Sequence, residues 1–96
     1  MNREAVSESL TKGLKERRGK LEIIEDVLFV AKNGVRKTEI VYKTNLNFAR
    51  IASYLQYLEE KGLLEISGTF YKTTSKGKKF LRNYQKLKDV LLTEEV

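Results

Sequence analysis

Lysine and arginine side chains supply most of the chemistry that this 96-residue sequence offers. They number 19 against 13 aspartates and glutamates, for a net charge of +6. Such a surface attracts polyanions, for example nucleic acid or an anionic membrane. The chain has no cysteine and no histidine, so it lacks disulfides, Cys/His metal ligands, thiol nucleophiles and the commonest general base. Ionic contact with an anion is therefore the chemistry to look for.

Carboxylates perform acid–base or metal chemistry when two of them face one another. Here Glu22, Glu25 and Asp26 fall on one predicted helix, and Glu59 and Glu60 fall on another, without a facing pair. The sequence also lacks a glycine-rich phosphate loop and any serine with a histidine partner. We therefore expect a protein that is not an enzyme and that uses no cofactor or metal.

A binding face is predicted on the segment 48–61. Its apolar residues recur at helical spacing and centre one buried stripe: Ile51, Leu55 and Leu58. Asn47 suits the N-cap of this helix, and Gly62 suits its C-terminal end. The opposite face then carries Ala49, Arg50, Ser53, Gln56 and Tyr57. Small side chains allow close approach to a groove, and Arg50 can make one strong guanine or phosphate contact. The alternative is an ordinary solvent-facing surface.

Further cations flank this face. Residues 37–44 are predicted to form a short second helix, with Arg36, Lys37 and Lys43 near its ends. Lys37 and Thr38 can also present backbone N–H groups to a phosphate. A solvated loop cluster is the alternative for these cations. The predicted contacts are Arg36, Lys37, Thr38, Lys43, Asn47, Phe48, Ala49, Arg50, Ser53, Tyr57 and Lys72.

Two other basic stretches stand out. Residues 72–88 hold seven cations and no acid, so Lys72 and its neighbours are placed near a polyanion backbone, or they keep a last helix soluble. Residues 12–20 hold five cations and one acid, and suit either a phosphate-contacting arm or a solvated linker. Among the aromatic residues, Phe48 and Tyr57 suit contact with nucleic acid. Four others follow core spacing and are predicted to be buried: Phe29, Phe70, Tyr71 and Phe80.

The elements that position these residues follow from periodicity. From Lys20, apolar residues at three- and four-residue spacing predict a first core helix ending before Gly34: Leu21, Ile24, Val27, Leu28 and Ala31. After Gly62, two β-prone runs about Ser67-Gly68 predict a hairpin. Thr74 or Ser75 then caps a last helix, whose apolar seam is Phe80, Tyr84, Leu87 and Leu91. Residues 1–17, with Val6, Leu10 and Leu14, are read as a short helix or loose arm.

The order helix, short helix, helix, hairpin, helix is that of a winged helix-turn-helix, a mostly α (α+β) fold with a two-stranded wing. In that geometry the third helix enters the DNA major groove and the hairpin lies along the backbone. Three segments follow: an arm over 1–17, the winged-helix domain over 18–74, and a C-terminal helix over 75–96.

The residues also resemble a known family, the small archaeal winged-helix DNA-binding proteins that dimerise through a C-terminal antiparallel coiled coil. The segment 37–48, KTEIVYKTNLNF, resembles the family stretch K-T-x-I-M-Y-x-A-N-L-S-Y, and 18–24, RGKLEII, resembles the opening of its first domain helix. Patterns in 54–64 and 71–81 are shared by many winged-helix regulators. The resemblance spans 18 to about 82. Asn47 replaces the family serine, and the C-terminal helix is shorter than the family's.

The resemblance implies that the last helix pairs with that of a second copy, forming a homodimer. The alternative partner for the seam is the stripe Val6, Leu10 and Leu14 of the same chain, which would give a monomer. We expect binding to double-stranded DNA, as a transcriptional regulator or a chromosomal architectural protein. A protein-interaction module and an RNA-binding protein are the alternatives.

Neither a membrane span nor a small-molecule ligand is expected. No apolar run approaches the roughly 18 residues that cross a bilayer. The N-terminal segment lacks the apolar core of a signal peptide. The sequence shows no ligand pocket, and a cytoplasmic, nucleoid-associated location is the resulting expectation.

Overall fold

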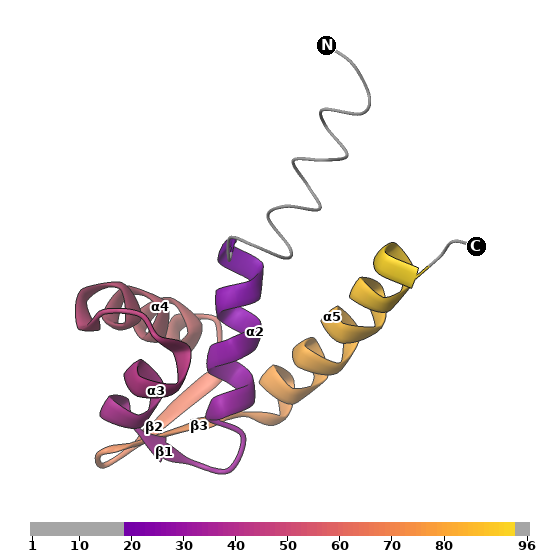
Figure 1. The fold of residues 1–96 in the computed structure, drawn as a ribbon. Coiled ribbons are helices and arrows are strands. Elements are labelled where there is room, and N and C mark those ends of the chain that lie inside the picture. Colours follow the sequence, from indigo (N-terminus) through magenta and orange to yellow (C-terminus); the bar gives the residue numbers. More distant parts are fainter. Residues whose placement is uncertain (1–18, 94–96) are drawn as a thin grey trace.

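The computed structural model describes residues 19–93. The predicted arm over 1–17, with its apolar stripe, lies outside these residues, as do positions 94–96. The elements in chain order are α2 (Lys20–Val30), β1 (Val35–Arg36), α3 (Lys37–Thr44), α4 (Phe48–Glu60), β2 (Leu64–Ser67), β3 (Phe70–Thr73) and α5 (Ser75–Thr93). Helices α2, α3 and α4 gather at one end of the molecule with the sheet, and α5 extends away from them (Figure 1).

The core lies where α2, α3 and α4 meet the sheet and the first turns of α5. Its buried side chains are Ile23, Ile24, Val27, Leu28, Ala31, Ile40, Ile51, Leu55, Leu58, Leu64 and Leu81. The predicted stripe of α4 is confirmed in full. Leu21, which was predicted to share the core stripe of α2, is 52% exposed, so that assignment is wrong. Ile23 is buried instead, because the buried face of α2 is centred nearer to Ile23 and Ile24.

The predicted hairpin is confirmed, and a third strand joins it. The sheet has the order β1-β3-β2, and both strand pairs are antiparallel. Ser67 pairs with Phe70, so the connecting residues are Gly68 and Thr69, one position later than predicted. Gly68 has φ +63°, a left-handed conformation that favours glycine at this turn.

Two phenylalanines predicted to lie in the core are on the surface. Phe29 is 58% exposed and Phe70 is 45% exposed, so both assignments are wrong. Each ring has a cation over it: Lys32 Nζ lies 5.5 Å from the Phe29 centroid, and the Arg36 guanidinium lies 5.4 Å from that of Phe70. Tyr71 and Phe80, by contrast, are partly buried against the core, as predicted.

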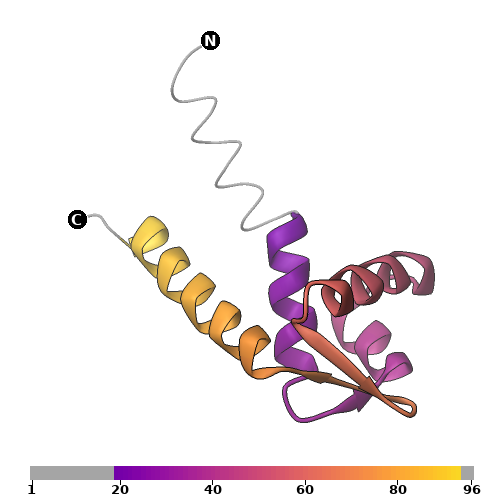
Figure 2. The ribbon, with the colours of Figure 1, turned by 180° about the vertical axis from the view of Figure 1, so that it is seen from behind.

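The start of α5 is tied to the end of α4. The Thr74 hydroxyl accepts a hydrogen bond from the Gly77 amide at 3.0 Å, which confirms Thr74 as the cap, and it donates to the Gly62 carbonyl at 2.7 Å. Lys76 Nζ also donates to the Lys61 carbonyl at 2.8 Å. Seen from behind, α5 leaves this junction and diverges from α2 along its length (Figure 2). The junction therefore anchors the base of a projecting helix.

Candidate nucleic-acid interface

The exposed face of α4 is the centre of the candidate interface. Ile51, Leu55 and Leu58 are at most 3% exposed, and they hold α4 against the core. The opposite face is exposed, and it carries the predicted residues Ala49, Arg50, Ser53, Gln56 and Tyr57. Asn47 caps the helix as predicted, because its side-chain oxygen accepts from the Arg50 amide at 2.8 Å. The cap and the core contacts together fix which side chains α4 presents.

Most other predicted contact residues are accessible to solvent. Arg36, Thr38, Lys43, Phe48 and Lys72 are all exposed, and Lys37 is partly buried. The start of α3 has no side-chain cap, so its first amide groups are not engaged by an N-cap side chain. Such amides suit a phosphate oxygen. Lys43 Nζ lies 3.2 Å from a Glu39 carboxylate oxygen on the surface of α3, and must leave this exposed pair to contact a phosphate.

Two residues at this surface were not among the predicted contacts. Lys20, at the start of α2, lines a hollow together with Ser53, Tyr54 and Tyr57 of α4. The basic stretch over 12–20 was the signal that pointed to it. Phe70 lies beneath the Arg36 guanidinium on the outer face of the sheet, where Arg36 pairs in register with Phe70. A cation–π contact with a ring restricts the guanidinium, whose N–H groups can still donate to a partner.

The basic stretch over 72–88 divides between two roles. Lys76 and Lys88 are engaged within the protein, by the Lys61 carbonyl and by Glu25 respectively. Lys72, Lys79, Arg82 and Lys86 are exposed on β3 and α5. Part of the predicted phosphate-binding charge is therefore structural.

The predicted seam of α5 also divides into two parts. Phe80 and Tyr84 stack with ring centroids 6.2 Å apart and are partly buried. Further along the helix, Leu87 is 55% exposed and Leu91 is 59% exposed, next to Val90 at 63%. The distal half of α5 thus presents an apolar surface that the rest of the described chain does not bury.

A membrane-spanning helix and a metal-binding cluster are both absent from the part of the chain that the structure describes. Within residues 19–93, no helix is both long and apolar enough to cross a bilayer. In the same range, no cluster of three or more acidic, histidine or cysteine side chains is arranged to hold a metal ion.

A profile of the winged helix-turn-helix family matches residues 17–92, so the chain belongs to this family. It is similar to Sso10a-2, a DNA-binding protein from Sulfolobus solfataricus: 26% identity, TM-score 0.64, covering 77% of this chain and 85% of that one. It is also 24% identical over 87 residues to the uncharacterized protein MJ0287 of Methanocaldococcus jannaschii, 90% of each chain. The resemblance to small archaeal winged-helix proteins is thereby confirmed.

A further solved structure shows the fold alone. Bordetella bronchiseptica BpsR, whose DNA binding is regulated by 6-hydroxynicotinic acid, is 14% identical with a TM-score of 0.69. The match covers 91% of this chain and 70% of that one. The arrangement of helices and sheet is therefore common to proteins of very different sequence.

Proposed function

We propose that this protein binds double-stranded DNA as a homodimer, and acts as a transcriptional regulator or a chromosomal architectural protein at the nucleoid. The observation that carries the proposal is the exposed face of α4, small at Ala49 and Ser53 and cationic at Arg50. Lys20 of α2 lines a hollow beside this face, and further cations are exposed on α3 and β3. The similarity to Sso10a-2, a DNA-binding protein, supports it. In this proposal the domain over 18–74 contacts the DNA and is called the reading head. The helix over 75–96 makes the dimer contact, and the arm over 1–17 is an accessory segment.

The proposed DNA contacts are of two kinds: contacts to base edges, which read the sequence, and contacts to phosphates, which position the protein. The α4 face enters the major groove, where Arg50 can contact a guanine in bidentate geometry. Backbone phosphates are contacted by Lys37, by the Thr38 amide and by Lys43 once it leaves Glu39. Arg36 of β1, held on Phe70, and Lys72 of the wing also contact the backbone. With a single strong base contact per protomer, affinity comes chiefly from phosphates, and sequence preference is weak.

Salt dependence tests this directly. Raising salt from about 50 to 200 mM should lower the affinity for one duplex at least tenfold, because each phosphate contact releases condensed counterions. The measurement is a fluorescence-anisotropy titration with a labelled duplex, and a double-stranded RNA of the same sequence is the competitor. A salt-independent affinity would contradict the electrostatic basis of the proposal. Preference for the RNA would favour the RNA-binding alternative.

A pair of substitutions separates reading from positioning. Arg50→Ala should lower affinity by about 1–3 kcal/mol and relax any preference among sequences. Lys43→Ala should weaken all duplexes alike and reduce the salt slope by about one unit. Both residues are exposed cations, so the comparison changes charge equally. If Arg50→Ala binds like the parent while its circular dichroism spectrum is unchanged, α4 does not read the groove.

The choice between regulator and architectural protein needs a different measurement. Chromatin immunoprecipitation across the genome should give discrete peaks for a regulator and even coverage for an architectural protein. The weak sequence preference expected from one arginine per reading helix favours broad coverage.

A further inference from the structure

Burial of α5 side chains against the rest of the described chain decreases along the helix. Leu81 is 4% exposed and Tyr84 is partly buried, but every side chain from 89 to 92 is exposed. Lys88 is the last side chain before that stretch that is not exposed. Figures 1 and 2 show α5 beginning beside the sheet and separating from α2 toward its far end. The contacts around Lys88 are therefore the outermost partly buried contacts of α5 in the described chain.

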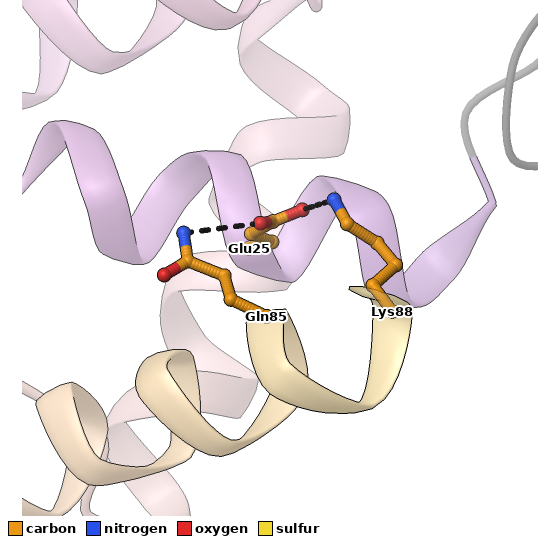
Figure 3. Close-up of polar contacts among 3 residues, drawn as sticks. All are labelled: Glu25, Gln85 and Lys88. Atoms are coloured by element: carbon orange, nitrogen blue, oxygen red, sulfur yellow. Dashed lines mark hydrogen bonds and ion pairs between the residues drawn. The ribbon is translucent and has the colours of Figure 1, made fainter. Parts of the chain in front are cut away.

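A polar cluster at this point joins three side chains of α5 and α2. Lys88 Nζ lies 2.6 Å from Glu25 Oε1, and Gln85 Nε2 donates to Glu25 Oε2 at 3.3 Å. Figure 3 shows both side chains reaching from α5 to the single carboxylate on α2. The Glu25 side chain is only 12% exposed and that of Lys88 is 24% exposed. Both carboxylate oxygens are thus held from adjacent turns of α5, in a site largely screened from water.

The carboxylate of Glu25 stabilises the charged form of Lys88. Burial alone would lower the pKa of Lys88, but the hydrogen bond and charge of Glu25 outweigh it, and the pKa of Lys88 is raised. The Lys88 ammonium also lies 5.4 Å from the centroid of the Tyr84 ring. Burial raises the pKa of the Tyr84 phenol, so the ring stays neutral beneath the cation. Lys88 is therefore charged and held in place at neutral pH.

A partly buried ion pair of this kind adds little net stability but can specify geometry. Apolar contacts between two helices tolerate sliding and tilting. Two hydrogen bonds to one carboxylate tolerate little change in distance or angle. We propose that Lys88, with Gln85, is a positioning residue that sets the angle of α5 against α2 through Glu25, and thereby the separation of the two reading helices in the dimer. This inference rests on the proposed DNA-binding dimer.

The geometry of a long helix makes this angle consequential. Helix α5 has 19 residues, and such a helix is about 28 Å long. A tilt of about 10° would move its far end by about 5 Å. Successive base pairs are only about 3.4 Å apart along the duplex. A small change at Lys88 therefore shifts one reading helix by more than one base pair relative to the other.

The test uses the full chain and measures the distance between protomers. The sequence has no cysteine, so Tyr42→Cys, at a position 84% exposed on α3, gives one unique spin-label site per protomer. Pulsed electron resonance on the parent dimer should show one narrow distance. Lys88→Met should shift the mean distance between the two labels, or widen the distribution of distances, by about 5 Å or more. Lys86→Met, an equal charge loss at an exposed position of the same helix, should leave it unchanged.

A DNA readout and a rescue complete the experiment. Lys88→Met should lose preference for one spacing between two half-sites, while its affinity for a duplex long enough for one reading head matches Lys86→Met. Exchanging the charges with Glu25→Lys and Lys88→Glu should restore the parent distance. If Lys88→Met does not fold, Glu25→Gln replaces it. An unchanged distance in a folded variant overturns the inference alone, whereas no interprotomer signal in the parent overturns the dimer and the inference with it.

Discussion

Leu87→Glu is expected to convert the protein from a dimer to a monomer of 11.1 kDa. Leu87 is 55% exposed on the distal half of α5, and burial of a leucine side chain contributes about 1.5–3 kcal/mol. A twofold interface contains each contact twice, so the loss doubles. Placing a carboxylate in that apolar contact adds a desolvation cost. Together these effects should weaken dimerisation by about a thousandfold or more.

Sedimentation equilibrium at tens of micromolar measures this directly. The parent should run near twice the 11.1 kDa chain mass, and Leu87→Glu near once. Arg82→Glu, a larger charge change at an exposed position of α5, should remain dimeric and is the control. A monomeric parent would contradict the dimer and favour packing of the seam on Val6, Leu10 and Leu14 of the same chain.

Monomerisation should also weaken DNA binding by more than the loss of any single contact. In the dimer, binding of one reading head raises the effective concentration of the other at the neighbouring half-site. A monomer keeps the same α4 face, including Arg50, but binds each site independently. Leu87→Glu should therefore lose affinity for a long duplex while its α4 face remains intact, which separates assembly from reading.

The helices of the reading head could be predicted closely because their ends depend on local signals. Asn47 accepts from the Arg50 amide three residues later, a bond within one turn of the chain. Asn45, with φ 61°, ends α3 in the left-handed conformation that asparagine tolerates. The exposed face of α4 then follows from its helical period, so most of the candidate site needed no tertiary information.

The parts that were missed depend on distant contacts. Strand β1 has two residues, and it is a strand only because β3, more than thirty positions away, pairs with it. Its register puts Phe70 on the outer face of the sheet beneath Arg36, whereas the spacing of the aromatic residues predicted a core position. Lys20 lies beside the candidate interface because α2 and α4 are placed so that it lines a hollow with Ser53 and Tyr57. Each of these placements is set by packing between segments.

Gly77 shows most directly how a tertiary contact can reverse a local expectation. Glycine in the first turn of a helix is less favourable than alanine by about 1 kcal/mol, so helix propensity predicts that Gly77→Ala stabilises the protein. In the structure, a Cβ at this position would collide with the Leu63 carbonyl oxygen and would lie 2.6 Å from Thr73 Cγ2. That carbonyl also accepts a hydrogen bond from the Thr74 amide at 3.0 Å, so it cannot move without loss of the bond. Close packing of α5 against the α4–β2 connection requires glycine here.

We therefore expect Gly77→Ala to destabilise the protein by about 3 kcal/mol, at the upper end for overpacking, because backbone must move. For a domain of this size the melting temperature should fall by about 15 °C. Gly19→Ala makes the same chemical change at the start of α2, where nothing lies within 4 Å of the added Cβ. It should cost less than about 1 kcal/mol. Thermal unfolding followed by circular dichroism compares the two. A Gly77→Ala protein that melts above the parent would mean that helix propensity outweighs packing at this junction, and that α5 starts further from α4 than described.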